Sequence, residues 1–269
     1  MINISYSKSF VAFLDILGFK NIVNKSRTNE GLQKLNEIFN TINQEIEELK
    51  KIPAKKKIGY ITISDSIILS IPQSQNNGDN INIFRQLCIA IGLIQKNLAM
   101  KNIWLRGAIS SGDTYFDSKL NQIVGPAYVA AYTLQETIAK TPRVIIDSKI
   151  IHELGRDSAY DLIDNINELS QGGLRYRNWQ SPILHKWDDT NMILTHDIPL
   201  FIDYLSPFVL NETSDLLKLI QIIKTNLYED INLYNKYRWV ADYLSIICLK
   251  YPDSREPIIT EAMEVLSKL

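Results

Sequence analysis

Apolar positions change their spacing along the first part of the chain. Residues 9–15 (SFVAFLD) form a continuous apolar run that ends in Asp15, a pattern typical of a strand that is buried on both faces. From Leu32 to Leu49 the apolar residues recur at steps of three and four, as on one face of an amphipathic helix. The sequence therefore begins with a buried strand followed by a long helix.

The segments that follow predict a hairpin, a second helix and further strands. Two β-rich runs meet at Ser64-Asp65-Ser66, which indicates a tight turn between strands. The predicted elements are strands at 58–64 and 66–71, a helix at 81–100, a strand at 103–111, a short strand pair around 114–124, a helix at about 125–140 and a strand after Pro142. This order favours an α+β fold with a ferredoxin-like βαββαβ core and an antiparallel sheet.

The second half of the chain has a weaker pattern. We expect a core at 1–150 and a C-terminal extension at 151–269 that is mixed at first, then helical, and packed on the core. Helical periodicity appears near 211–227, 231–250 and 255–268. Because no Gly/Ser/Pro-rich linker separates the halves, the extension is interpreted as an elaboration of the same domain.

Composition and charge exclude several classes of protein. The 269 residues are 45% hydrophobic with a formal net charge of −1. The chain therefore has no excess of positive charge to attract nucleic acid or an anionic membrane. No apolar run reaches the roughly 18 residues that a membrane span needs. Cys88 and Cys248 lie in apolar helical runs and are expected to be buried, reduced thiols. We expect a cytoplasmic protein that binds neither nucleic acid nor membrane.

Two carboxylates suggest a site at one edge of the sheet. Asp15 and Asp65 are 50 positions apart, yet the predicted topology places the end of the first strand beside the hairpin turn. Carboxylate oxygens favour Mg²⁺ or Mn²⁺, and the backbone amides of residues 16–20, at a turn into a helix, could hold phosphates. Alternatively, Asp15 caps the helix and Asp65 occupies a turn.

Four segments resemble a known family. FVAFLDILGF, the SDS hairpin, LRGAISSGD and GPAYVAAYTLQETIAKTPRVIID occur in the order and at about the spacing of the class III nucleotidyl cyclase catalytic domain. The LRGAIS run and the AY-x-L…PR-x-x-I segment are most similar to the pyrimidine cyclases of the bacterial Pycsar antiphage system. The resemblance covers about residues 8–150, and KYRW at 236–239 and IPLFIDYL also look like features of that branch.

The resemblance implies roles for individual residues. Asp15, Asp65 and the carbonyl of Ile16 would bind two Mn²⁺ or Mg²⁺ ions per site. The turn formed by Ile16, Leu17, Gly18 and Phe19 would hold the triphosphate. Arg106 would lie near the phosphates, where a planar guanidinium donates two parallel hydrogen bonds. The alternative for Arg106 is a pair with a surface carboxylate.

Other positions depart from the purine cyclases of this class. Their adenine-reading Lys and Asp correspond to Ile61 and Gln122, which disfavours ATP as substrate. Gln122 could contact a base edge, and Tyr60 could make the pocket smaller. The structural alternatives, which are favoured for both residues, are a turn residue for Gln122 and a strand core or surface residue for Tyr60. The Asn and Arg expected on the third helix correspond to Val129 and Thr133.

The resemblance implies a lyase that converts UTP to 3′,5′-cyclic UMP, with CTP as the close second, in antiviral defence. The site would lie across a two-fold homodimer interface. Because Val129 and Thr133 replace the Asn/Arg pair, Arg143 is a candidate substitute, and an inactive nucleotide-binding regulator is the first alternative. The second is a ligand-free interaction module. We expect a solvent-facing Asp15, whose replacement would leave stability unchanged.

Overall fold

The computed structural model describes residues 4–51, 56–171, 181–186, 200–250 and 257–269. Its largest feature is one mixed sheet with the strand order β2-β3-β1-β4-β6-β8-β7, and β5 pairs with β4 outside this path. The strands are β1 (Ser7–Ile16), β2 (Gly59–Ile63), β3 (Ser66–Pro72), β4 (Leu105–Asp117), β5 (Gln122–Val124), β6 (Val144–Ile146), β7 (Leu184–Lys186) and β8 (Leu200–Ile202).

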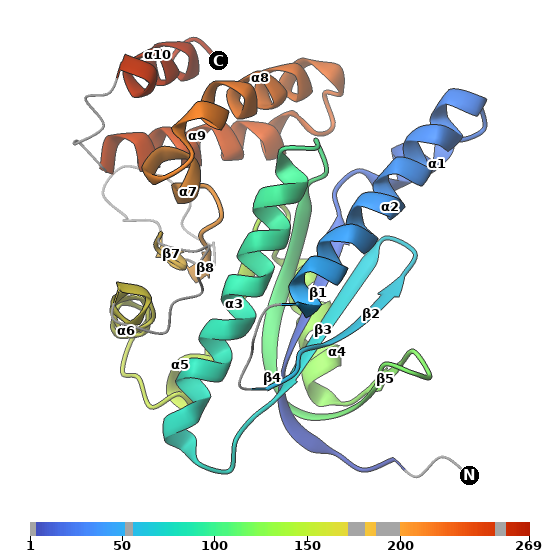
Figure 1. Cartoon of the computed structure of the whole chain (residues 1–269), viewed down its shortest axis with the longest axis vertical. Helices are drawn as coiled ribbons and strands as arrows, with labels where there is room; N and C mark the ends of the chain where they lie inside the picture. Colours follow the sequence, from blue (N-terminus) through green and yellow to red (C-terminus); the bar gives the residue numbers. More distant parts are fainter. Residues whose placement is uncertain (1–3, 52–55, 172–180, 187–199, 251–256) are drawn as a thin grey trace.

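Ten helices surround the sheet in the described part of the chain. They are α1 (Phe19–Lys25), α2 (Asn29–Lys50), α3 (Asn77–Ala99), α4 (Pro126–Thr137), α5 (Lys149–Glu153), α6 (Ala159–Gln171), α7 (Ser206–Leu210), α8 (Thr213–Glu229), α9 (Tyr234–Lys250) and α10 (Pro257–Leu266). Helices α2 and α3 cover one face of the sheet and α4 covers the other, while α8, α9 and α10 gather at one end of the molecule (Figure 1).

The first four sheet strands confirm the predicted fold class. The order β2-β3-β1-β4, with every neighbouring pair antiparallel, is the arrangement of a ferredoxin-like βαββαβ core. The sheet then continues with β6, which is parallel to β4 because α4 makes a crossover between them. The predicted helical C-terminal elaboration is also present, in α7 to α10.

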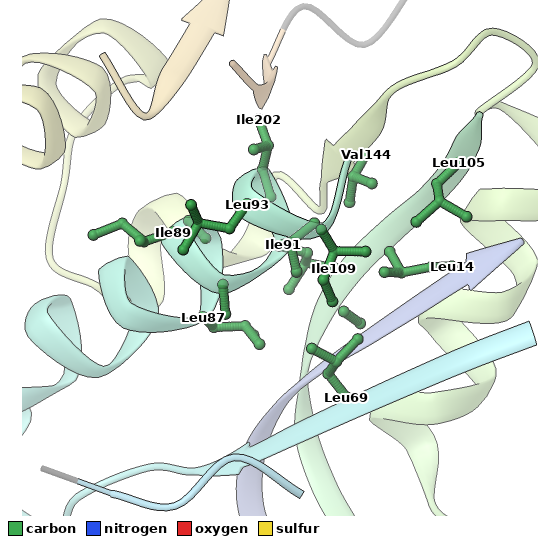
Figure 2. Close-up of a cluster of buried hydrophobic side chains, with 14 of the residues drawn as sticks. Leu14, Leu69, Leu87, Ile89, Ile91, Leu93, Leu105, Ile109, Val144 and Ile202 are labelled. Carbon is green, nitrogen blue, oxygen red and sulfur yellow. The ribbon is translucent and has the colours of Figure 1, made fainter. Parts of the chain in front are cut away.

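Burial on both faces explains the apolar run in β1. Phe10 and Leu14 face the cluster under α2 and α3, whereas Val11 and Phe13 face the cluster under α4. Figure 2 shows Leu14 among the strand side chains that meet α3. Since a central strand with two covered faces has no solvent-facing positions, its sequence shows no alternation of apolar and polar residues.

The second half of the chain extends the same sheet. Strand β8 pairs with β6, with Phe201 opposite Ile145, and β7 pairs with β8. Helices α7 to α10 share a second apolar cluster that includes Trp104 and Ala108 of the first half. The division at residue 150 stays a prediction.

Two further expectations concern cysteines and the membrane. Cys88 and Cys248 are both buried, as predicted. In the part of the chain that the structure describes, none of the helices is both long and apolar enough to cross a membrane.

Candidate metal and phosphate site

The structure brings Asp15 and Asp65 together at one edge of the sheet. Asp15 lies near the end of β1, opposite Ser66 of β3, and Asp65 lies in the β2–β3 turn, where Ser64 has a φ of 55°. The amide of Ile16 donates to the carbonyl of Asp65 over 3.2 Å, which ties the turn to β1. The Asp65 carboxylate is close enough to raise the pKa of the Asp15 carboxyl group. The register of the sheet thus places Asp15 and Asp65, which are remote in sequence, next to each other.

Asp15 is enclosed by donors on the same face of the sheet. Arg106 of β4 donates from Nε over 2.8 Å and from Nη2 over 2.7 Å to Oδ2 of Asp15. Gln135 of α4 donates from Nε2 to the same oxygen over 3.1 Å. The Asp15 side chain is only 14% exposed. The expectation of a solvent-facing Asp15 is therefore wrong, because α4 covers this end of the strand.

Burial makes ionised Asp15 costly. The pKa of Asp15 is raised from 3.8 to about 6, chiefly because burial disfavours the charged form; Arg106 lowers the pKa, and the neighbouring Asp65 raises it. The two carboxylates repel each other when both are charged. A divalent cation would remove that repulsion, so the pair fits such an ion.

Asp15 and Asp65 would provide only two side-chain ligands to a metal ion. Within the described residues, no group of three or more His, Cys, Asp or Glu side chains is placed to hold a metal ion. Two carboxylates suit Mg²⁺ or Mn²⁺, which usually complete their coordination with water and substrate phosphate oxygens. They do not suit a closed four-ligand zinc site.

The turn after β1 presents backbone groups beside the carboxylates. Gly18 has a φ of 76° and precedes α1, a conformation that glycine adopts without steric cost. The amides of Ile16 and Leu17 donate to the carbonyls of Asp65 and Trp104, so these two amides are already engaged. The donors left for a phosphate are those that open α1, at Gly18, Phe19 and Lys20, since the first N–H groups of a helix lack partners within it.

A pocket of about 470 Å³ adjoins this turn. Its lining includes Leu17 and Gly18 of the turn together with Leu233 and Tyr237. Lys34 and Asp230 add charge of both signs to its lining. The turn therefore borders a cavity large enough for a small ligand, whose lining does not include Asp15 or Asp65.

The two expected base-contacting residues are not brought to Asp15. Tyr60 packs against the apolar cluster under α2 and α3, on the opposite face of the sheet from Asp15. Gln122 is exposed on β5, opposite Asp117 at the far end of β4. Residues 106 and 117 are separated by 11 positions (117 − 106), or roughly 35 Å of extended strand. In Figure 1, β5 lies far from the α1 end of β1.

The third-helix positions and Arg143 also lie away from the carboxylates. Val129 and Thr133 are exposed on α4. Arg143 is 2% exposed, and its Cζ lies 5.7 Å from the ring centroid of Phe201 and 5.2 Å from that of Trp239. Arg143 therefore stabilises the second apolar cluster through cation–π contacts, and it does not face the site.

Three residues near Asp15 were not identified from the sequence. Gln135 donates to its carboxylate, and Lys236 interacts electrostatically with Asp15, Arg106 and Lys140. Gln135 lies inside the segment that carries the resemblance, but its spacing in the sequence does not identify it as a site residue. Lys236 belongs to α9, whose position beside the Gly18 turn depends on tertiary packing.

The fold and site define an α+β domain with a ferredoxin-like core and a carboxylate pair beside a glycine turn. No protein family model matches the chain, and no curated protein matches it. Among solved structures, the adenylyl cyclase CyaB from Pseudomonas aeruginosa is 12% identical, with a TM-score of 0.43, over 75% of this chain and 95% of that one.

Two other solved structures are similar over part of their length. A bacterial light-regulated adenylyl cyclase is 16% identical, with a TM-score of 0.40, over 57% of this chain and 47% of that one. A class III adenylyl cyclase-like ATP-binding protein from Pseudomonas aeruginosa is 11% identical, with a TM-score of 0.41, over 60% and 36%. The chain thus spans less than half the length of these two proteins.

Proposed function

We propose that the chain is a divalent-metal-dependent nucleotidyl cyclase of the class III type. The observation that supports this proposal is the meeting of Asp15 and Asp65 beside the Gly18 turn. Asp15, Asp65 and the carbonyl of Ile16 would hold two Mn²⁺ or Mg²⁺ ions, and the amides that open α1 would bind the triphosphate. When bound, the ions lower the pKa of the ribose 3′-hydroxyl and neutralise charge on the departing pyrophosphate.

The protein's own residues position the substrate. Gln135 and Arg106 donate to Oδ2 of Asp15, so Oδ1 would be the oxygen that binds a cation shared with Asp65. Arg106, once Asp15 binds a metal ion, is free to donate its planar guanidinium to phosphate oxygens. Catalysis by this set is positioning and charge neutralisation, with no covalent enzyme intermediate.

A pyrimidine triphosphate is the proposed substrate, converted to 3′,5′-cyclic UMP from UTP or to cyclic CMP from CTP. Ile61, where purine cyclases have a lysine, is buried in the apolar cluster under α4 and offers no charge to a base. We further propose cytoplasmic second-messenger synthesis in antiphage defence, on the basis of the sequence resemblance.

A homodimer with sites at its interface is part of the proposal. In their own chain, Gln122 lies at the far end of β4 from Arg106, and Tyr60 lies on the opposite face of the sheet from Asp15. Exposed apolar side chains on α4 and its surroundings, Val129, Tyr132 and Val124, provide a surface for a second copy. The partner's β4–β5 hairpin would then supply the base contact.

The decisive experiment incubates the protein with each of the four NTPs and Mn²⁺ and resolves the products by mass spectrometry. We expect a cyclic pyrimidine nucleotide and pyrophosphate, and no product from Asp65→Ala, because one metal-binding carboxylate is lost. Mn²⁺ titration of both proteins is the second readout. Equal, negligible Mn²⁺ binding would favour the interaction module in place of the enzyme.

An inactive, nucleotide-binding regulator is the second candidate. The burial of Arg143 between Phe201 and Trp239 favours it, because the guanidinium expected to replace Thr133 is held in the apolar core. Nucleotide binding without a cyclic product from any NTP would establish the regulator.

A further inference from the structure

The start of α9 packs against the Gly18 turn. A Cβ atom on Gly18 would lie 3.4 Å from Cδ1 of Leu233, the residue that directly precedes α9. One helical turn later, the ring of Tyr237 meets that of Trp104 edge to face, with centroids 5.8 Å apart. The carbonyl of Trp104 accepts the hydrogen bond from Leu17, so α9 touches both chain segments that border the turn.

Lys236 lies between these two contacts on α9. It is half-buried, and among the residues that the structure describes no carboxylate oxygen lies within 4.0 Å of its Nζ. Burial lowers the pKa of Lys236, and the charges of Arg106 and Lys140 lower it further, while Asp15 and Asp230 raise it. A half-buried ammonium group with two other cations nearby is unfavourable until an anion joins them.

The neighbouring cations come from separate elements. Arg106 belongs to β4 and is directed to Asp15. Lys140 follows α4, and its Nζ donates to the carbonyl of Glu136. The three cations therefore come from different parts of the fold. Lys236 is near the other two only because α9, a helix of the C-terminal extension, packs at this position.

We propose that Lys236 is a polyphosphate-binding residue that completes, with Arg106 and Lys140, a cationic cluster beside the Gly18 turn. The inference deepens the proposed cyclase function and rests on it for the identity of the ligand as a nucleoside triphosphate. A triphosphate chain presents several anionic oxygens, which matches a group of three cations. The extension thereby becomes part of the active site.

Isothermal titration calorimetry with inorganic tripolyphosphate and Mg²⁺ tests the proposal on the full chain. We expect Lys236→Ala to weaken binding at least about tenfold, because a hydrogen-bonded charge pair is lost. Lys236→Arg should retain most of the affinity. Lys218→Ala is the matched control, since Lys218 is an exposed lysine on α8 of the same extension. Thermal melting of every variant verifies folding.

The outcomes separate this inference from the proposed cyclase activity. Lys236-dependent tripolyphosphate binding without any cyclic product supports the cluster and rejects the cyclase. A cyclic product with equal tripolyphosphate affinity in wild type, Lys236→Ala and Lys218→Ala overturns the cluster and leaves the cyclase standing. Absence of tripolyphosphate binding by the wild type also overturns the cluster.

Discussion

Asp15 combines two properties that a strand residue seldom has together. Its backbone is central to the sheet, between Ser66 of β3 and Arg106 of β4. Its carboxylate is nevertheless largely covered and held beside a second carboxylate, Asp65. Without a bound metal ion, this arrangement lowers the free energy of unfolding relative to a fully apolar strand end. We interpret that cost as a consequence of a binding role, because folding alone gains little from the pair.

A stability measurement follows from the raised pKa of Asp15. Since the folded pKa, about 6, exceeds the usual 3.8, folding favours the protonated form, and this contribution is present below 3.8 and lost as pH rises through about 6. The amide introduced by Asp15→Asn imitates the protonated carboxyl group at every pH. The variant should therefore melt several degrees above wild type at about pH 8 without metal, since about 1 kcal/mol moves the Tm by roughly 2–4 °C.

The control for this prediction is an exposed carboxylate. Asp164→Asn changes the same chemical group on the surface of α6, and its Tm should follow that of wild type across the pH range. The difference between Asp15→Asn and wild type should shrink as the pH falls and nearly vanish close to pH 4. A Tm difference that does not depend on pH would contradict the raised pKa as the cause.

The Gly18 turn is the element that joins sheet, helix and extension. It ends β1, begins α1 and contacts Leu233 before α9. A short helix of seven residues has little stability alone, so its orientation depends on these neighbours. The predicted phosphate-binding role of the turn therefore relies on contacts from three parts of the chain.

Replacing Gly18 by alanine should affect both stability and binding. A left-handed conformation costs an L-residue roughly 1–2 kcal/mol, which urea denaturation would detect. Gly155→Ala is the matched control, because Gly155 has a φ of 69° and a Cβ there meets nothing within 4 Å. Both variants should lose similar stability, and only Gly18→Ala should lose Mg²⁺-tripolyphosphate affinity. Equal affinities would argue against the turn as a phosphate site.

At the scale of the whole molecule, one sheet connects two apolar clusters. The first lies between the sheet and helices α2 and α3, and the second gathers α7 to α10 around Tyr243 and Leu244. Strands β6 and β8 contribute to both clusters, with Val144 and Ile202 in the first and Ile145 and Phe201 in the second. The extension is thus positioned rigidly enough against β4 for α9 to reach the site.

Assembly can be tested on the exposed surface of α4. Val129 is 58% exposed, and a glutamate there would place charge in the proposed dimer interface. We expect Val129→Glu to shift a dimer to a monomer in light scattering and to lose product formation at an unchanged Tm. Leu249→Glu, at an exposed apolar residue on α9, should remain dimeric. A monomeric wild type that makes product would contradict the shared site.

Much of the fold was predictable because the spacing of apolar residues along the chain differs between helices and strands. The run at β1, the three-and-four spacing of α2 and the hairpin at Ser64 each matched the structure within a few residues. Asp15 and Asp65 were also predictable neighbours, since the order of elements brings the strand end to the turn. The face of the sheet on which Tyr60 lies was not predictable, because one position along a strand reverses the face to which a side chain points, and its role in base contact stays a prediction.

The sequence by itself determined the order of strands and helices, the apolar faces they bury and the meeting of the carboxylate pair, because these follow from periodicity and chain connectivity. Only the tertiary structure decided that Gln135 covers Asp15, that Arg143 lies in the core and that Lys236 stands beside Arg106. The reason is physical: the partners of a charged side chain depend on how elements that are distant in sequence pack together. The pattern of residues along a single chain does not predict that packing.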